Sequence, residues 1–396
     1  MKPVIDLDVE YSLVLEGGGA KGAYQIGAWK ALKEAGVKIN AVAGTSVGAL
    51  NGALICMDDV DKALNLWENI SYSKVMDVDD TIMNDLLNRT GKIRENTKEV
   101  LRIIKDKGAD VTPLKNMISE NIDEEIIRNG HINFYLLTFS LSDFRELDLD
   151  LKEEPEGLLE DYLLASAYLP VFKNEKLHGK KYMDGGIINN VPLSSLITRG
   201  YKNIIMIRIF GIGREPKVKI PDDVEVYSIE PKVNLGNILD FSSSKSRRNI
   251  KIGYYDACRF IYGLKGKIYY IDENEKEWYY LEQLTNISEE LMIRICLSYG
   301  ATVEETDSIL RTYLEEILPV IADLLKLQSG WTYKELYISI LEASAKLLKV
   351  KKYNIYSVQE LENEVIARYE KNSKADDIPD FVSIITKSVI IKEDNQ

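Results

Sequence analysis

Two apolar runs, each followed by a glycine-rich turn and a helical pattern, open the chain. Residues 11–15 (YSLVL) predict a buried strand, and residues 37–43 predict a second one. Each run leads through glycines into an alanine-rich segment that predicts a helix, at residues 23–34 and 47–57. A strand, a turn and a helix repeated in this way predict a parallel sheet with functional sites at the ends of its strands.

Further strand and helix patterns follow over the first 275 residues, with a mostly helical stretch at residues 58–128, and then the composition changes. Further strands are predicted at residues 132–141, 146–151, 176–183, 203–210 and 225–229, and further helices at residues 158–168, 192–200 and 242–262. Beyond about residue 275 the chain is helical, charged and poor in glycine. We therefore expect a main domain at residues 1–275 and a helical region at residues 276–396. The role of this helical region, as a lid, a dimer contact or a partner contact, stays open.

Composition and charge disfavour several classes of protein. A net charge of −13 argues against nucleic acid as the main partner and against simple electrostatic binding to anionic membranes. No apolar run reaches the roughly 20 residues that a membrane span needs, and the acidic N-terminus lacks the apolar segment of a secretory signal. Cys56, Cys258 and Cys296 are far apart and have no metal-site spacing. These features predict a cytoplasmic protein.

The first glycine-rich turn, residues 17–22, also fits the G-x-G-x-x-G pattern of dinucleotide-binding sites. That pattern expects an acidic residue about 20 positions further on, at the end of the second strand. The second strand here leads into residues 43–46 (AGTS), and Glu34 lies inside the preceding predicted helix. A phosphate-binding loop is disfavoured as well, because Lys21 is followed by Gly22 and not by serine or threonine.

The second turn, Gly44-Thr45-Ser46-Val47-Gly48, fits the G-x-S-x-G pattern of serine hydrolases. Glycines two positions before and two positions after Ser46 allow a strained turn that exposes the serine hydroxyl. The alternative is that Ser46 only caps the following helix, a role that the same five residues would also allow. The predicted strand before the turn and the predicted helix after it favour a nucleophile.

A serine nucleophile needs backbone N–H groups directed at the oxyanion that forms during the reaction. Val47, which follows the serine, is expected to supply one of them. Parallel pairing of the first two strands would bring Gly17, Gly18 and Gly19 to the same sheet edge, with Gly18 and Gly19 as the expected further donors. Lys21 is expected either to anchor this loop or to be a solvated surface residue.

The base that accepts the serine proton has three candidates. The chain contains only two histidines, His131 and His178, and both stand in polar, turn-like stretches that are expected at the surface. Asp184 ends a predicted strand, and Gly185 and Gly186 after it permit close approach to another loop. A carboxylate accepts a serine proton well only where water is excluded, so Asp184 as the base predicts an apolar cleft. The alternative for Asp184 is a turn aspartate that bonds to its own backbone.

Residues 17–22 (GGGAKG), 44–48 (GTSVG) and 184–186 (DGG), in this order, resemble the motifs of the patatin-like phospholipases, a family of lipid acyl hydrolases. The resemblance covers about residues 8–210. It implies a three-layer α/β/α fold with a mostly parallel central sheet, followed here by the helical C-terminal region. It also implies a catalytic dyad without histidine, formed by Ser46 and Asp184. The implied oxyanion hole is Gly17, Gly18, Gly19 and Val47, supported by the motif residues Lys21, Gly22, Gly44, Gly48, Gly185 and Gly186.

The resemblance implies hydrolysis of phospholipids or other long-chain acyl esters through an acyl-enzyme, without metal or cofactor. Two alternatives stay open: a soluble carboxylesterase or thioesterase acting on short acyl chains, and a non-enzymatic lipid-binding protein on the same fold. A helix at residues 242–262 either contacts a membrane surface transiently or packs with a solvated basic end, formed by Lys245, Arg247, Arg248 and Lys251. Residues 165–172 (ASAYLPVF) are similar to the family's stretch before the aspartate, although Tyr168 replaces a small residue and Phe172 comes one position early. The oligomeric state is left open.

Overall fold

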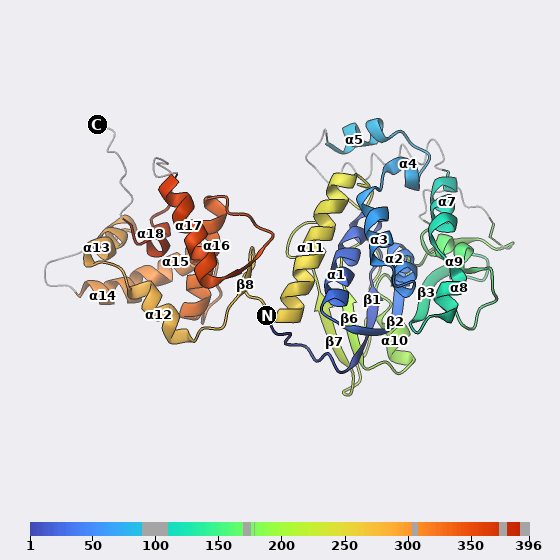
Figure 1. The fold of residues 1–396 in the computed structure, drawn as a ribbon, viewed down its shortest axis with the longest axis horizontal. Coiled ribbons are helices and arrows are strands. Elements are labelled where there is room, and N and C mark those ends of the chain that lie inside the picture. Colours follow the sequence, from blue (N-terminus) through green and yellow to red (C-terminus); the bar gives the residue numbers. More distant parts are fainter. Residues whose placement is uncertain (89–109, 169–175, 178, 303–307, 372–377, 389–396) are drawn as a thin grey trace. The chain divides into compact units, whose positions relative to one another are not determined.

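The computed structural model describes residues 1–88, 110–168, 176–177, 179–302, 308–371 and 378–388 of the 396-residue chain (Figure 1). These residues form two compact units, Lys2–Tyr262 and Gly263–Gln396, the second of which includes Met1. The chain passes from one unit to the other after Tyr262, a little before residue 275, where the amino-acid composition changes.

A mixed seven-stranded sheet forms the centre of the first unit. Its strand order is β4-β3-β2-β1-β6-β7, and β5 pairs with β3. The pairs β1–β2, β2–β3, β1–β6 and β6–β7 are parallel, whereas β4 and β5 run antiparallel to β3. The mostly parallel central sheet that the sequence predicts is therefore confirmed. The strands are β1 (Glu10–Leu15), β2 (Lys38–Thr45), β3 (Asn133–Ser140), β4 (Arg145–Asp150), β5 (Tyr182–Asp184), β6 (Asn203–Ile207) and β7 (Glu225–Ile229).

The segment before Asp184 contains less strand than its sequence predicts. The pattern favours a strand over residues 176–183, but β5 begins only at Tyr182. Leu177 and Lys180 instead bond to each other, the N–H of each donating to the carbonyl of the other at 2.9 and 3.0 Å. Gly179 between them has a φ of 78°, a left-handed conformation that favours glycine, and the strand begins only after this turn.

Helices pack on both faces of the sheet because successive residues of a strand point to opposite sides (Figure 1). Val42 lies against Gly52 of helix α2 (Val47–Cys56), where a Cβ on the glycine would come within 3.1 Å of the valine. Ala41 and Ala43, on the other side, pack in one cluster with Leu196 of helix α10 (Leu193–Thr198).

A second helix on the α2 face, α1 (Ala23–Glu34), packs closely along α11 (Ser243–Tyr262). Gly27 of α1 and Gly253 of α11 permit this approach, since a Cβ on either would lie 1.9 Å from a main-chain carbonyl oxygen of the facing helix. The remaining α-helices among the described residues of this unit are α3 (Val60–Glu68), α4 (Tyr72–Val75), α5 (Asp80–Asn88), α7 (Thr112–Asn121), α8 (Glu124–Asn129) and α9 (Leu159–Ser166).

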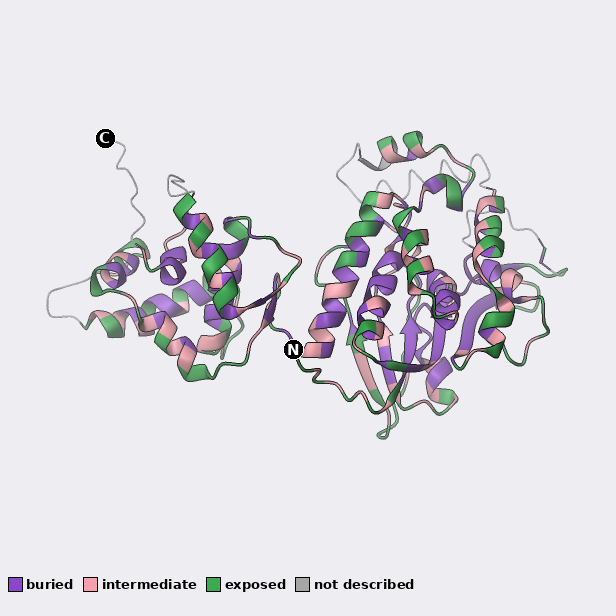
Figure 2. Ribbon diagram, viewed as in Figure 1, coloured by how far each residue is buried: buried purple, intermediate pink, exposed green. Residues whose placement is uncertain are grey.

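The central strands are buried along most of their length (Figure 2). Every residue of β1 after Glu10 is buried, and so is every residue of β3 after Asn133. Parallel strands covered by helices on both faces read as continuous apolar runs, which is why the run at residues 11–15 identified β1 correctly. The carboxyl ends of β1 and β2 carry the two glycine-rich turns.

The second unit is mainly helical, with two short paired strands. Its core contains Tyr280, Tyr313 and Leu336. The carboxylate of Glu342, itself buried, accepts hydrogen bonds from three consecutive main-chain N–H groups, at residues 267–269. The elements are β8 (Tyr270–Asp272), α12 (Glu277–Thr285), α13 (Glu289–Ser298), α14 (Ile309–Thr312), a π-helical turn (Tyr313–Ile317), α15 (Leu318–Leu324), α16 (Tyr333–Leu347), β9 (Ile355–Ser357), α17 (Val358–Lys371) and α18 (Val382–Thr386).

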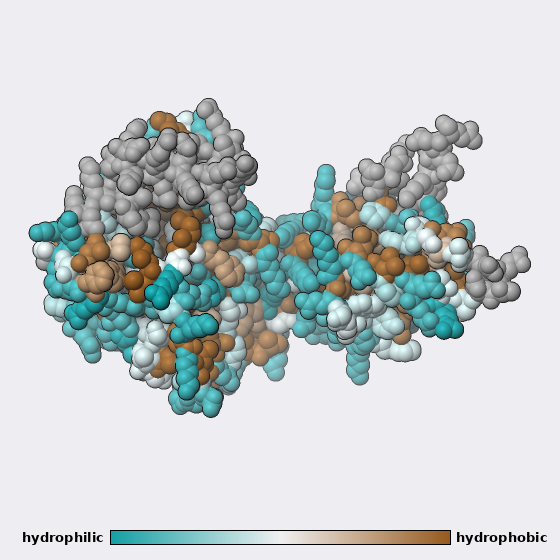
Figure 3. Space-filling model, turned by 180° about the vertical axis from the view of Figure 1, so that it is seen from behind, coloured by the Kyte–Doolittle hydropathy of each residue, from teal (hydrophilic) through white to brown (hydrophobic). Residues whose placement is uncertain are grey.

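Hydrophilic side chains are interspersed with smaller apolar groups on the face of the molecule drawn in Figure 3. Within the described ranges, no helix combines the length and the apolar character that crossing a membrane requires.

Candidate active site

Ser46 stands in a strained turn between β2 and α2. β2 ends at Thr45 and α2 begins at Val47, so the serine is the N-cap of the helix. Its φ is 56° and its ψ is −127°, a positive φ that residues with a side chain rarely adopt. Only 7% of the residue is exposed. Strain of this kind is typical of functional turns and is maintained here by the packing around it.

The glycines on either side of Ser46 are required by close main-chain contacts. A Cβ on Gly44 would lie 2.3 Å from the carbonyl oxygen of Gly48, across the turn. A Cβ on Gly48 would lie 2.2 Å from the carbonyl oxygen of Leu15, the last residue of β1. The first glycine therefore lets the turn close, and the second lets α2 approach the neighbouring strand.

Strand β3 brings Asp184 to Ser46. Thr45 of β2 pairs with Leu137, and Asp184 of β5 pairs with the next residue of β3, Thr138. β4 pairs along one side of β3, so β2 and β5 share the other side. β2 pairs with β3 up to Leu137, and β5 pairs with it from Thr138 onward. Ser46 Oγ donates a hydrogen bond to Asp184 Oδ2 at 2.6 Å.

Burial makes Asp184 more basic than an exposed aspartate. The residue is 5% exposed, and burial raises its pKa to about 6, against the opposing effect of two hydrogen bonds. One is donated by the Ser46 hydroxyl to Oδ2, and the other by the Gly186 N–H to Oδ1 at 2.7 Å. The carboxylate is therefore mostly ionised at neutral pH, yet accepts a proton more readily than an ordinary aspartate.

The first glycine-rich turn presents main-chain N–H groups beside Ser46. The N–H of Gly17 donates to the carbonyl of Asn190 at 3.1 Å and is occupied. In the part of the chain that the structure describes, the N–H groups of Gly18, Gly19 and Val47 have no such acceptor, and all three residues line one cavity with Ser46. Gly19 has a φ of 54°, and a Cβ there would lie 2.2 Å from the carbonyl oxygen of residue 238, so this position requires glycine.

The other motif glycines also lie at tight contacts. A Cβ on Gly22 would come within 2.5 Å of the Val47 side chain. A Cβ on Gly185 would lie 2.6 Å from the Leu137 carbonyl oxygen, and one on Gly186 would lie 2.6 Å from Asn190 Oδ1. The structure thus brings the three sequence motifs into one packed arrangement.

A cavity of about 350 Å³ opens above the serine and the aspartate. Its wall is mostly apolar side chains from α2, α3, α4 and α7 and from the segment before α11. Members of this wall are Leu50, Leu54, Trp67, Ile70, Met76, Leu114, Ile118, Leu239 and Phe241. The apolar cleft that a carboxylate base requires is present.

Part of the chain matches a known protein family. Residues 13–197 match the family model described as patatin-like phospholipase. This segment belongs to the patatin-like phospholipase family. The resemblance seen in the three motifs is thereby confirmed, and the matched segment runs from β1 to α10 and contains all of them.

Individual proteins are similar to all or part of this chain. Patatin-like phospholipase domain-containing protein 7 of Rattus norvegicus is 27% identical over 202 residues, which is 50% of this chain and 13% of the rat protein. Lysophospholipase nte1 of Aspergillus terreus is 59% identical over 46 residues, 12% of this chain and 3% of the relative. Among solved structures, VipD from Legionella pneumophila aligns with a TM-score of 0.39 and 15% identity, covering 96% of this chain and 91% of VipD. The chain therefore matches only a small part of the curated relatives' length.

His131 stands apart from the serine in the described part of the patatin-like segment. His131 is exposed and lies two residues before β3 begins at Asn133, whereas Asp184 pairs near the other end of that strand. His178 lies outside the described residues. Among the described residues there is also no group of three or more histidine, cysteine, aspartate and glutamate side chains that could hold a metal ion.

Two residues of the segment before the aspartate hold Ser46 and Asp184 in place, a role that the sequence interpretation did not assign. Ser166 at the end of α9 accepts the Ser46 N–H at 2.9 Å and donates to the Leu137 carbonyl at 2.5 Å. The carbonyl of Tyr168 accepts the Asp184 N–H at 2.9 Å. The only sequence signal was their place in the family-like stretch 165–172, of which Pro170 and Phe172 lie outside the described residues.

Proposed function

We propose that the chain is a lipid acyl hydrolase of the phospholipase A type, with Ser46 as nucleophile and Asp184 as base. The observation that carries this proposal is the 2.6 Å hydrogen bond from Ser46 Oγ to Asp184 Oδ2 on the floor of the apolar cavity. A buried carboxylate in that position can accept the hydroxyl proton without a histidine between them. The patatin-like phospholipase and lysophospholipase names of the relatives support the same reaction class.

The reaction follows from this geometry in two halves. Asp184 takes the Ser46 proton while Oγ forms a bond to the ester carbonyl carbon, and the carbonyl oxygen becomes an oxyanion. When the tetrahedral intermediate collapses, the bond to the leaving alcohol breaks and Asp184 returns the proton to that alcohol. Asp184 then takes a proton from water while the water oxygen bonds to the acyl carbon of the acyl-enzyme. When this second intermediate collapses, the bond from Ser46 Oγ to the acyl carbon breaks, Asp184 returns the proton to Oγ, and the fatty acid is released.

The oxyanion is stabilised by main-chain amides in this mechanism. Val47 follows the nucleophile, and its N–H at the first position of α2 has no partner within the helix. Gly18 and Gly19 supply the other donors, because the N–H of Gly17 is already bonded to Asn190. Fixed donors in a water-poor site stabilise the transition state strongly, commonly by about 10²–10³ in rate for each donor.

The apolar wall of the cavity favours an alkyl chain as the acyl group, and this choice can be tested with a substrate series. Fatty-acid release is measured for wild type and Ser46→Ala on p-nitrophenyl esters of increasing acyl length and on phospholipid vesicles. We expect release from long-chain esters and phospholipids by wild type alone. Activity confined to the shortest esters would favour a soluble carboxylesterase or thioesterase. Binding of lipid without release by either protein would favour a lipid-binding protein.

The pKa of Asp184 sets the pH dependence expected for this mechanism. Only the ionised carboxylate can accept the Ser46 proton, and burial raises the pKa of Asp184 to about 6. On a neutral ester, kcat/KM should therefore be constant above this pH and fall about tenfold for each pH unit below it. Stopped assays from about pH 4 to pH 8 provide the measurement. A profile that stays flat through pH 5 would contradict Asp184 as the base.

A further inference from the structure

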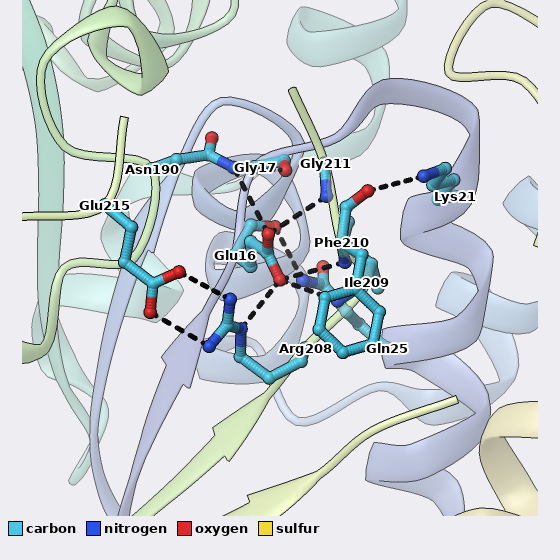
Figure 4. A network of polar contacts seen from close by, with 10 residues as sticks. All are labelled: Glu16, Gly17, Lys21, Gln25, Asn190, Arg208, Ile209, Phe210, Gly211 and Glu215. Atoms are coloured by element: carbon cyan, nitrogen blue, oxygen red, sulfur yellow. Dashed lines mark hydrogen bonds and ion pairs between the residues drawn. The ribbon is translucent and has the colours of Figure 1, made fainter. Parts of the chain in front are cut away.

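Glu16 is a buried carboxylate directly before the three glycines of the first turn. β1 ends at Leu15, which pairs with Ile207, the last residue of β6. The residues that follow these parallel strands, Glu16 and Arg208, therefore lie side by side at the carboxyl ends of the strands, as Figure 4 shows. Glu16 is 3% exposed and takes no part in the proposed proton transfers.

The Glu16 carboxylate binds the main chain that follows β6 (Figure 4). Oε2 accepts the N–H groups of Ile209 at 2.8 Å and Phe210 at 3.0 Å, and Oε1 accepts that of Gly211 at 2.9 Å. Two side chains also donate to it, Arg208 through Nε at 2.9 Å and Asn190 through Nδ2 at 3.4 Å. A buried charge with this many donors is fully compensated and holds the segment 208–211 firmly.

Lys21, on the other side of the glycines, binds the same segment. Its Nζ donates to the Phe210 carbonyl at 2.6 Å. Between the two anchors the backbones are in direct contact, since a Cβ on Gly211 would lie 1.8 Å from the Gly17 carbonyl oxygen. The glycine turn thus rests on segment 208–211 and is fastened to it at both ends.

Glu215 balances the charge of Arg208 on the side away from Glu16. Its two terminal nitrogens bind Glu215, at 3.0 and 2.8 Å, while its Nε binds Glu16. This arrangement fixes Arg208 in one orientation beside Glu16.

We propose that Glu16 and Lys21 are positioning residues, which hold the N–H groups of Gly18 and Gly19 where the oxyanion forms. The inference rests on the proposed function of Ser46 and Asp184. Three consecutive glycines have little conformational preference of their own, so the loop needs an external support to keep its amides fixed. Amides that are held in place before the reaction stabilise the oxyanion without reorganisation, whereas a displacement of about 1 Å can cost about 100-fold in rate.

The test is Glu16→Gln, measured with a readout specific for the oxyanion. The variant keeps the shape of the side chain and one acceptor oxygen but places an amide N–H₂ against main-chain donors. We expect kcat for a long-chain ester to fall about 100-fold with KM nearly unchanged. Affinity for an alkyl trifluoromethyl ketone, which forms a tetrahedral adduct with Ser46, should fall by a similar factor. Binding of the corresponding fatty alcohol, which forms no oxyanion, should not change.

Glu342→Gln is the matched control, because Glu342 is a buried carboxylate that also accepts three consecutive main-chain N–H groups. It lies in the second unit and should leave kcat and ketone affinity at the wild-type values. An equal loss in both variants would overturn the positioning role, as would wild-type ketone affinity in Glu16→Gln. Inactive wild type, or an active Ser46→Ala, would instead refute the proposed function.

A second variant keeps the inference testable if Glu16→Gln does not fold. Lys21→Met removes the bond to the Phe210 carbonyl, and the positive charge near Glu16, from a partly exposed side chain. We expect kcat and trifluoromethyl ketone affinity to fall together, by about tenfold. Unchanged values for a folded Lys21→Met would overturn the inference.

Discussion

Replacing Asp184 with asparagine should lower kcat/KM for ester hydrolysis by about three to four orders of magnitude. Asparagine has the same shape, and its Oδ1 can still accept the Gly186 N–H that now binds the carboxylate. It cannot accept a proton from the Ser46 hydroxyl, which donates to Asp184 at 2.6 Å. The measurement is steady-state hydrolysis of a long-chain ester, with KM expected to remain close to the wild-type value.

The same substitution should not destabilise the protein, which separates lost chemistry from lost folding. Burial raises the pKa of Asp184 from the ordinary aspartate value to about 6, so ionisation of this group opposes folding above that pH. The cost is absent where both folded and unfolded forms are protonated, below about pH 4, and is complete above about pH 6. An asparagine at this position carries no such cost. Asp184→Asn should therefore increase the free energy of unfolding at neutral pH by roughly 1–3 kcal/mol, and not in acid.

His131→Ala is the comparison that decides between aspartate and histidine as the base. His131 is exposed and lies before the start of β3, so its removal should leave kcat/KM at the wild-type value. A dead His131→Ala or His178→Ala beside an active Asp184→Asn would revive a histidine-based mechanism and refute the dyad.

Replacing Gly48 with alanine should reduce kcat/KM by at least about 100-fold and destabilise the fold by about 1–3 kcal/mol. The added Cβ would lie 2.2 Å from the carbonyl oxygen of Leu15 and 2.8 Å from its carbon, so α2 has to move away from β1. Ser46 and Val47 move with α2, whereas the first glycine turn follows β1. The proposed nucleophile and the proposed oxyanion donors would therefore separate. Kinetics and thermal unfolding measure the two effects.

Gly130→Ala serves as the control for adding a methyl group to a glycine. Gly130 has a φ of −70°, and its nearest contact for a Cβ is 3.2 Å from the carbonyl oxygen of Ile126. Its substitution should change activity little. If Gly48→Ala were as active as Gly130→Ala, the close packing of α2 on β1 would not be needed for catalysis.

Local patterns in the sequence predicted the elements around the two glycine turns well. The helix expected at residues 23–34 is α1 with the same bounds, and the strand expected at 225–229 is β7. These segments are determined by nearby residues: a buried apolar run, a glycine turn and the end of a helix. The strand before Asp184 was predicted too long, because the turn at Gly179 is decided by a single left-handed residue within a charged stretch.

The supports of the candidate site could not be found in the same way. Glu16 follows the strand predicted at residues 11–15 and belongs to no sequence motif, and its partners are main-chain groups 193 to 195 positions away. Ser166 is one small residue among alanines, and its role depends on where α9 ends beside Leu137. Such roles come from tertiary contacts, for which residue type and spacing carry no local signal. The motifs marked the groups proposed for the chemistry, but not the groups that hold them.

The pairing of β2 and β5 along one edge of β3 has an evolutionary consequence. Ser46 and Asp184 are 138 positions apart in sequence, but Thr45 and Asp184 are aligned by adjacent residues of one strand. Insertions, deletions or exchanges between α2 and β3 leave this alignment unchanged as long as β3 stays paired. That interval includes α3, α4 and α7, which supply much of the cavity wall. The fold therefore allows the pocket to diverge toward new ligands while the geometry of the serine and the aspartate is inherited intact.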